Sequence, residues 1–123
     1  MTHSLNWFEI PVKDLNRARA FYSKILNEDV HEVATPNLKY AYLPANVAQG
    51  GIGGALAEGG GYEPSATGTV VYLNGGEDLD IPLARVSEAG GQVILPKTSL
   101  GNMGFMALFI DSEGNKVGFH SMK

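Results

Sequence analysis

The sequence predicts an α+β fold of two tandem βαβββ modules, whose eight strands form one curled mixed sheet around a cavity. A strand-like stretch runs directly into a helix-like one over residues 6–22, and the same order of elements returns from residue 69. In each module a helix covers only one face of a sheet, so the other face needs a partner. Pairing the two modules provides one and leaves room for a small ligand.

The first module begins with a strand and a helix. Two sets of residues alternate with the period of two that is typical of a strand, namely Trp7, Glu9 and Pro11 against Phe8, Ile10 and Val12. Asp14 stands where a helix N-cap is expected, and apolar residues recur at helical spacing up to a predicted end near Asn27. Further strands are predicted at 30–35, 38–44 and 50–58, and the last has so little side-chain bulk that another group must approach its backbone closely.

The second module repeats this order. A strand is predicted over 69–75, followed by one helix with Asp78 as its cap, Pro82 in its first turn and Gly90 at its end. The three remaining strands are predicted at 92–97, 103–111 and 116–121.

Short matches relate the two modules. Asp14 and Leu15 recur as Asp78 and Leu79, 64 residues later, and "IGGA" at 52–55 matches "VGFH" at 117–120, 65 residues later. Two copies of a repeat of this length fill the chain, and a single domain is predicted. Its expected parts are a first module at 4–58, a Gly-rich linker at 59–67 and a second module at 68–123.

Composition excludes several classes of function. The 123 residues are 44% hydrophobic and 18% charged, as in a folded globule. The net charge is −4 and the nine Lys and Arg form no basic stripe, which argues against nucleic acid as a partner. No apolar run approaches the ~20 residues of a membrane span and no signal-peptide layout is visible, so a cytoplasmic protein is expected. With no cysteine, disulfides and thiolate metal sites are excluded.

Three stretches carry a resemblance to a known family: "WFEIPVKDLNRARAFYSKIL", "VVYLNGGEDLDIPLARVSEAGG" and "DSEGNKVGF". The sequence resembles the vicinal oxygen chelate superfamily, which contains glyoxalase I, extradiol dioxygenases, fosfomycin-resistance enzymes and bleomycin-resistance proteins. The resemblance implies paired βαβββ modules and a homodimer. It also implies that metal-dependent members bind a divalent ion through ligands on the first and last strands of each module.

The metal-ligand positions of the family fall here on residues that do not bind metals. The first-strand positions correspond to Trp7 and Val70, and the last-strand positions to Gly53 and Gly118. Divalent ions need several oxygen or nitrogen donors that converge on one point. The chain therefore resembles the metal-free branch of the superfamily, in which the cavity binds organic molecules, and no cofactor is expected.

Glu9 and His120 are the two catalytic candidates. Glu9 shares a strand face with Trp7, where partial burial is expected to raise its pKa and make it a general base or an anchor for a cationic group. Alternatively, Glu9 lies at the rim and pairs with a neighbouring cation or amide. His120 lies two residues beyond Gly118, where it is either a proton shuttle or an idle, partly exposed histidine.

Aromatic residues dominate the predicted ligand-binding face. Trp7 either stacks on an aromatic ligand or packs in the core, and Tyr40 is a further candidate. Tyr72 stands at the position that matches Glu9, so it is expected on the same face. The predicted ligand-binding residues are Trp7, Glu9, Tyr42, Gly53, Tyr72, Phe105, Gly118 and His120. The residues predicted to pack helix against sheet are Phe8, Ile10, Phe21, Tyr22, Val71 and Leu73.

The function predicted first is metal-independent binding of a small organic molecule, as in a sequestering resistance protein or a sensor. A homodimer is expected, because the open sheet edges are safer when covered. Two alternatives stay open. One is a lyase or isomerase with Glu9 as base and His120 or Tyr72 as helper, and the other is a glyoxalase- or dioxygenase-type enzyme that recruits Glu9 and His120 as metal ligands. The fold does not identify the ligand.

Overall fold

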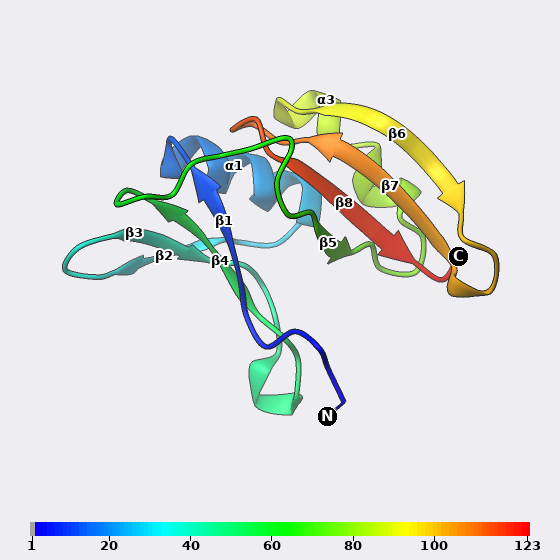
Figure 1. The fold of residues 1–123 in the computed structure, drawn as a ribbon, viewed down its shortest axis with the longest axis horizontal. Coiled ribbons are helices and arrows are strands. Elements are labelled where there is room, and N and C mark those ends of the chain that lie inside the picture. The colour runs from blue at the N-terminus through cyan, green and yellow to red at the C-terminus, as the bar shows by residue number, and fades with distance from the viewer. Residues whose placement is uncertain (1) are drawn as a thin grey trace.

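The computed structural model describes residues 2–123 as two four-stranded mixed sheets with helices packed against them (Figure 1). The first module contains β1 (Phe8–Val12), α1 (Leu15–Leu26), β2 (His31–Ala34), β3 (Lys39–Tyr42), the 3₁₀ turn η1 (Val47–Gln49) and β4 (Gly54–Glu58). The second contains β5 (Val71–Asn74), α2 (Asp80–Leu83), α3 (Val86–Ala89), β6 (Gln92–Ser99), the 3₁₀ turn η2 (Gly101–Met103), β7 (Phe105–Ile110) and β8 (Lys116–Ser121).

The two sheets share one topology. Their strand orders are β1-β4-β3-β2 and β5-β8-β7-β6, and in each the first strand pairs in parallel with the last. This confirms the predicted α+β fold of two βαβββ modules, with sheets that are not closed into a barrel. Within the described residues, no helix is both long and apolar enough to cross a membrane.

Helix α1 forms as predicted. Asp14 Oδ1 accepts a hydrogen bond from Arg17 N at 3.1 Å and so caps the first turn. Asn27 adopts the left-handed conformation, with φ of 55°, and ends the helix. One stripe of α1 is buried, which comprises Leu15, Ala18, Phe21, Tyr22 and Ile25.

The single helix predicted in the second module is wrong, because the segment forms two short helices, α2 and α3. Pro82 has no N–H, so the Asp78 carbonyl accepts from Ile81, three residues on, at 3.1 Å. A second bond of this 3₁₀ type forms at Arg85, whose N–H donates to the Pro82 carbonyl, three residues back, at 3.0 Å. Gly90 ends α3 in the left-handed conformation, as expected.

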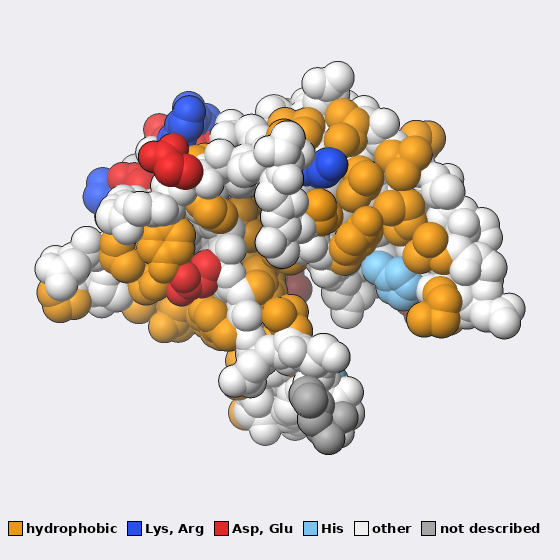
Figure 2. All heavy atoms as spheres, viewed as in Figure 1, with side chains coloured by type: hydrophobic (Ala, Val, Ile, Leu, Met, Phe, Trp, Pro, Cys, Tyr) orange, Lys and Arg blue, Asp and Glu red, His pale blue; other side chains and the backbone are white. Residues whose placement is uncertain are grey.

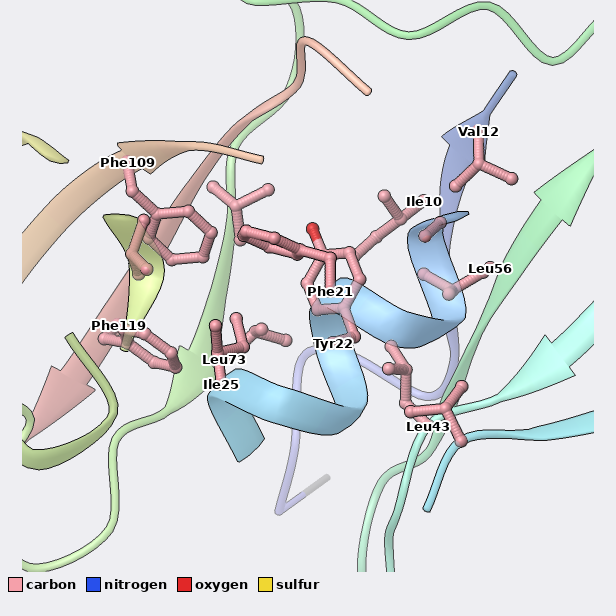
Figure 3. Close-up of a cluster of buried hydrophobic side chains, with 14 of the residues drawn as sticks. Ile10, Val12, Phe21, Tyr22, Ile25, Leu43, Leu56, Leu73, Phe109 and Phe119 are labelled. Atoms are coloured by element: carbon pink, nitrogen blue, oxygen red, sulfur yellow. The ribbon is translucent and has the colours of Figure 1, made fainter. Parts of the chain in front are cut away.

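One hydrophobic core joins the modules (Figure 3). Helix α1 places Phe21 6.1 Å from Phe109 of β7, between ring centroids, while Ile10 and Leu56 of the first sheet pack on the same cluster. Burial of each such side chain contributes roughly 1.5–3 kcal/mol. The residues predicted to pack helix against sheet all belong to this cluster or pack against it, which confirms that prediction.

The observed register corrects the repeat offset of the last strands. Ile10 pairs with Leu56 and Leu73 pairs with Phe119, and all four are buried. Residues 10 and 73, like residues 56 and 119, are therefore equivalent at an offset of 63, two fewer than the "IGGA" and "VGFH" match suggests. The first-module counterpart of Gly118 is consequently Ala55, not Gly53.

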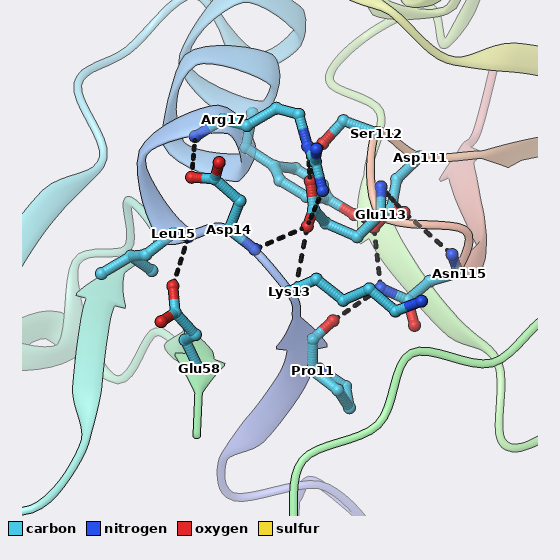
Figure 4. Close-up of polar contacts among 11 residues, drawn as sticks. Pro11, Lys13, Asp14, Leu15, Arg17, Glu58, Asp111, Ser112, Glu113 and Asn115 are labelled. Atoms are coloured by element: carbon cyan, nitrogen blue, oxygen red, sulfur yellow. Dashed lines mark hydrogen bonds and ion pairs between the residues drawn. The ribbon is translucent and has the colours of Figure 1, made fainter.

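A buried polar cluster also connects the modules (Figure 4). Glu113, in the β7–β8 turn, accepts hydrogen bonds from the backbone N–H groups of Lys13 and Asp14 at 2.9 Å and from Arg17 Nε at 2.7 Å. Beside it, the Tyr22 hydroxyl donates to Asp111 Oδ2 at 2.6 Å. These contacts fix the start of α1, and with it β1, against the second sheet.

Candidate functional site

Each sheet has a core face and an outer face, because successive side chains in a strand point to opposite sides. In the first sheet the core face carries Ile10 and Leu56. The register then places a set of aromatic, acidic and small residues on the outer face, namely Trp7, Glu9, Tyr40, Tyr42, Gly53, Ala55 and Ala57. The small residues of β4 lie between β1 and β3 and leave space for the larger side chains of those strands.

Trp7 and Tyr42 form an open aromatic pair on this face. Their ring centroids lie 5.6 Å apart in an edge-to-face arrangement at 81°. The indole lies over Gly53, where an added Cβ would stand only 3.1 Å from the ring atom Cζ3. Trp7 is 41% exposed and Tyr42 is 47% exposed. The structure therefore places three predicted ligand-binding residues together and leaves the two rings accessible.

A broad hollow of about 1020 Å³ lies beside the aromatic pair. Loops before β2 and after β3 complete its wall, including Glu28, Asp29 and Val47. Among the described residues that line it, two are acids and none is Lys or Arg. The hollow thus combines aromatic surface with negative charge.

Two phenols hold Glu9 on the same face. Tyr62, from the linker, donates to Oε1, and Tyr40 donates to Oε2 at 2.9 Å. The hydrogen bond from Tyr62 lowers the pKa of Glu9, and together with the one from Tyr40 it outweighs burial, which acts in the opposite direction. The raised pKa expected from the sequence is therefore wrong. Glu9 is a stable anion and a weak base.

Tyr72 and His120 lie on the outer face of the second sheet. The Tyr72 ring covers Gly118, where an added Cβ would stand 2.5 Å from ring atoms. His120 pairs with Asn74 in the register, and its Nε2–H donates to the Met103 carbonyl at 2.6 Å. That contact requires a proton on Nε2 and occupies one of the two ring nitrogens.

Phe105 does not share this face, contrary to the sequence prediction. It pairs with the buried Ser121 and packs against the hydrophobic core, and Lys97 Nζ lies 4.7 Å from its ring centroid. The neighbours on β7 that do face outward are Met106 and Leu108, which pair with His120 and Gly118. Phe105 was predicted from its aromatic type and not from the alternation along β7, which explains the error.

The two catalytic candidates are on different sheets. Glu9 extends from β1 and His120 from β8, and among residues 2–123 no hydrogen bond links them. The family's metal positions likewise bring no donors together, since Trp7 and Gly53 lie in contact and Gly118 lies under Tyr72. Within the described chain, no group of three or more His, Asp or Glu side chains is placed to hold a metal ion. The residues present do not fit such an ion.

Sequence reasoning missed Tyr62, Glu28 and Asp29. All three lie outside the strands, in the linker or in the loop after α1. In such segments the sequence has no periodicity that would indicate the direction in which a side chain points. A tyrosine within the Gly-rich linker was the only signal that the linker folds back onto a sheet.

Comparison with solved structures supports the same fold. A glyoxylase/bleomycin resistance protein/dioxygenase domain from Frankia sp. EAN1pec is 21% identical, with a TM-score of 0.67 over 100% of this chain and 94% of that one. The fosfomycin resistance protein FosX from Listeria monocytogenes is 21% identical, with a TM-score of 0.62 over 98% and 92% of the two chains. A glyoxalase I mutant from Zea mays is 21% identical, with a TM-score of 0.71, and 96% of this chain matches 46% of that one.

At this level of identity the structures establish the fold and no shared chemistry. Among curated proteins, none matches the sequence. The family comparison is decisive, because a model of one superfamily matches residues 4–119, nearly the whole chain. The chain belongs to the Glyoxalase/Bleomycin resistance protein/Dioxygenase superfamily.

Proposed function

We propose that this protein binds a small organic ligand without a metal, against the outer face of its first sheet. The observation that carries the proposal is the exposed Trp7–Tyr42 pair beside a hollow of about 1020 Å³. Apolar hollows with a few polar groups are the usual form of small-molecule sites, and exposed aromatic rings supply large contact area at low entropic cost. Trp7 also occupies a position that the family resemblance assigns to a metal ligand.

Homodimerisation is part of the proposal. Exposed apolar side chains lie on both sheets, and Figure 2 shows hydrophobic groups over each of them. Since α1 and the core faces pack together inside the chain, the outer faces keep exposed side chains such as Trp7, Tyr42 and Tyr72. A second copy, docked with two-fold symmetry, would shield them and turn the open hollow into an enclosed one. A cytoplasmic location stays a prediction.

A lyase or isomerase that uses Glu9 as base has less support. The pKa of Glu9 is lowered by Tyr62 and Tyr40, whereas a general base at neutral pH benefits from a raised one. His120 lies on the other sheet and is hydrogen-bonded to the backbone carbonyl of Met103 in η2. Binding therefore accounts for more of the geometry than turnover does.

The proposal is tested by a thermal-shift screen of aromatic compounds, followed by fluorescence titration of the hits. Trp7 is the only tryptophan, so its emission reports directly on the site. A ligand at a hundred times its Kd should stabilise the fold by about 2.7 kcal/mol. We expect the hits to change Trp7 emission and to keep their affinity in a chelator, and sedimentation should give the mass of a dimer.

Two variants serve as a matched pair in this experiment. Tyr42→Ala should weaken binding of the hits, whereas Ile81→Ala, which removes an exposed apolar side chain from α2, should not. The proposal fails if binding requires a stoichiometric transition-metal ion, or if no aromatic compound alters either the melting temperature or the Trp7 emission.

A further inference from the structure

We infer that the ligand is an organic cation, whose charge lies near Glu9 and whose apolar body lies against Trp7 and Tyr42. This inference rests on the proposed function and adds the chemical class of the ligand. It is drawn from Glu9 on the outer face, from two acids that line the neighbouring hollow, and from the two aromatic rings that line the same hollow.

Glu9 is an anion without a basic partner. Its two oxygens accept hydrogen bonds from Tyr62 and Tyr40, which are neutral donors and leave the negative charge uncompensated. Among residues 2–123, no Lys, Arg or His forms an ion pair with it. Glu113, another glutamate held by hydrogen bonds, contrasts with it, since Arg17 neutralises that side chain. A half-buried carboxylate of this kind favours a cation from outside the chain.

The hollow supplies the second set of acids. Glu28 and Asp29 reach it from the loop after α1, a segment unrelated to β1, and the described lining contains no Lys or Arg. An anionic ligand would therefore meet like charges from two directions, which disfavours it strongly.

The aromatic residues point to the same class. The faces of Trp and Tyr rings carry partial negative charge and attract ammonium groups, and Trp is the best of these acceptors. Trp7 and Glu9 stand two residues apart on one strand face, so a single small molecule can reach both. Tyr42 adds a second exposed ring at 5.6 Å from the indole. Rings next to carboxylates form the usual recognition site for alkylated ammonium groups.

The test is a titration of Trp7 fluorescence with three probes of similar size and different charge. They are benzyltrimethylammonium, benzyl alcohol and phenylacetate, each used with the full chain at low ionic strength. We expect the cation to bind at least about tenfold more tightly than the alcohol, and the anion to bind most weakly. The preference for the cation should decrease as salt is added, because exposed charges are screened.

Variants separate charge from shape. Glu9→Gln should remove most of the preference for the cation, while Glu88→Gln, which deletes an equal charge on the exposed surface of α3, should retain it. Because Glu9→Gln also alters the contacts with Tyr40 and Tyr62, the Glu28→Gln and Asp29→Asn double variant provides a second test. Both of its positions are exposed, and it should reduce the preference without changing the melting temperature.

The outcomes distinguish this inference from the proposed function. If the alcohol or phenylacetate binds as tightly as the cation, or if the broader screen finds only neutral and anionic ligands, the ligand is not a cation and the binding function stands. If no compound of any charge binds, both proposals are overturned. An unchanged preference in both the Glu9 variant and the double variant would also refute the inference.

Discussion

Replacing Glu113 by Gln should destabilise the whole chain, because this carboxylate joins the two modules (Figure 4). Its Oε1 accepts from the N–H groups of Lys13 and Asp14, both at 2.9 Å, and from Arg17 at 2.8 Å. Its Oε2 accepts from Arg17 Nε at 2.7 Å. A Gln side chain has one acceptor oxygen and would turn an N–H group toward the guanidinium. At least one donor therefore loses its partner.

The magnitude follows from the pKa of this group. Burial raises the pKa of Glu113, but hydrogen bonds from Arg17, from Asp14 N–H and from their neighbours outweigh burial and lower it from 4.5 to about 2. That difference corresponds to about 3 kcal/mol of folding free energy carried by the charged form. Because the Arg17 side chain is 52% exposed, solvent screens part of this. We expect a loss of about 2–3 kcal/mol and a melting temperature lower by roughly 6–15 °C.

The pH dependence has a definite sign. The pKa of Glu113 is lower in the folded chain than in the unfolded chain, so its stabilisation is complete above about pH 4.5 and is lost as the pH falls toward 2. The Gln variant lacks this titration and should lose less stability over that window. Urea unfolding at pH 7, 4.5 and 3 measures both effects. Glu88→Gln, which breaks a surface ion pair with Lys24, should cost less than about 1 kcal/mol at every pH.

The reasoning would be refuted by a Gln variant whose urea midpoint at pH 7 equals that of the natural chain. It would also be refuted if both proteins lost stability in parallel between pH 4.5 and 3, since the acid-sensitive group would then be a different one. A variant with lower stability but unchanged pH dependence would show that shape, and not charge, makes Glu113 important.

Two further predictions concern packing. Tyr22→Phe removes the buried hydroxyl that donates to Asp111 at 2.6 Å, and it should lower the free energy of unfolding by about 1–3 kcal/mol in urea; an unchanged midpoint would show that water replaces the donor. Gly118→Ala would place a Cβ 2.5 Å from the Tyr72 ring and should cost about 1–3 kcal/mol in thermal melts. Gly60→Ala, whose Cβ meets only ordinary contacts, should be nearly neutral, and equal effects at the two glycines would contradict this account.

Strand alternation and helix-capping residues predicted which elements form better than they predicted helix continuity. Strand alternation placed Ile10 and Glu9 on opposite faces, with Ile10 packed against the helix, and α1 begins at the Asp14 cap and ends at Asn27 as expected. The errors occur where a longer-range effect decides. The Arg85 N–H donates three residues back, to the Pro82 carbonyl, and two short helices form where one was expected.

Register is a second source of error, because pairing depends on the neighbouring strand. The β8 segment has several small or apolar residues in a row, so its sequence can be aligned with the first module at an offset of 65 or of 63, which differ by two residues. Both shifts preserve which face each residue occupies, and Gly118 was therefore expected on the correct face but opposite the wrong counterpart. Phe105 was assigned by residue type alone, and its pairing with Ser121 turns it to the core side of the sheet, where it packs against the core.

At the candidate site, strand alternation predicted which side chains share a face but not the ionisation behaviour of Glu9. Alternation put Trp7 and Glu9 on one face, but the chemistry of Glu9 depends on Tyr62, which is 53 residues away and lies in a Gly-rich linker. Burial by itself acts to raise the pKa of Glu9, which would suit a base, but the hydrogen bond from Tyr62, together with the one from Tyr40, outweighs burial and lowers the pKa. A persistent charge without a basic partner is suited to holding a cation rather than to moving a proton. The linker, which has no regular structure, thus bears directly on whether this face binds or reacts.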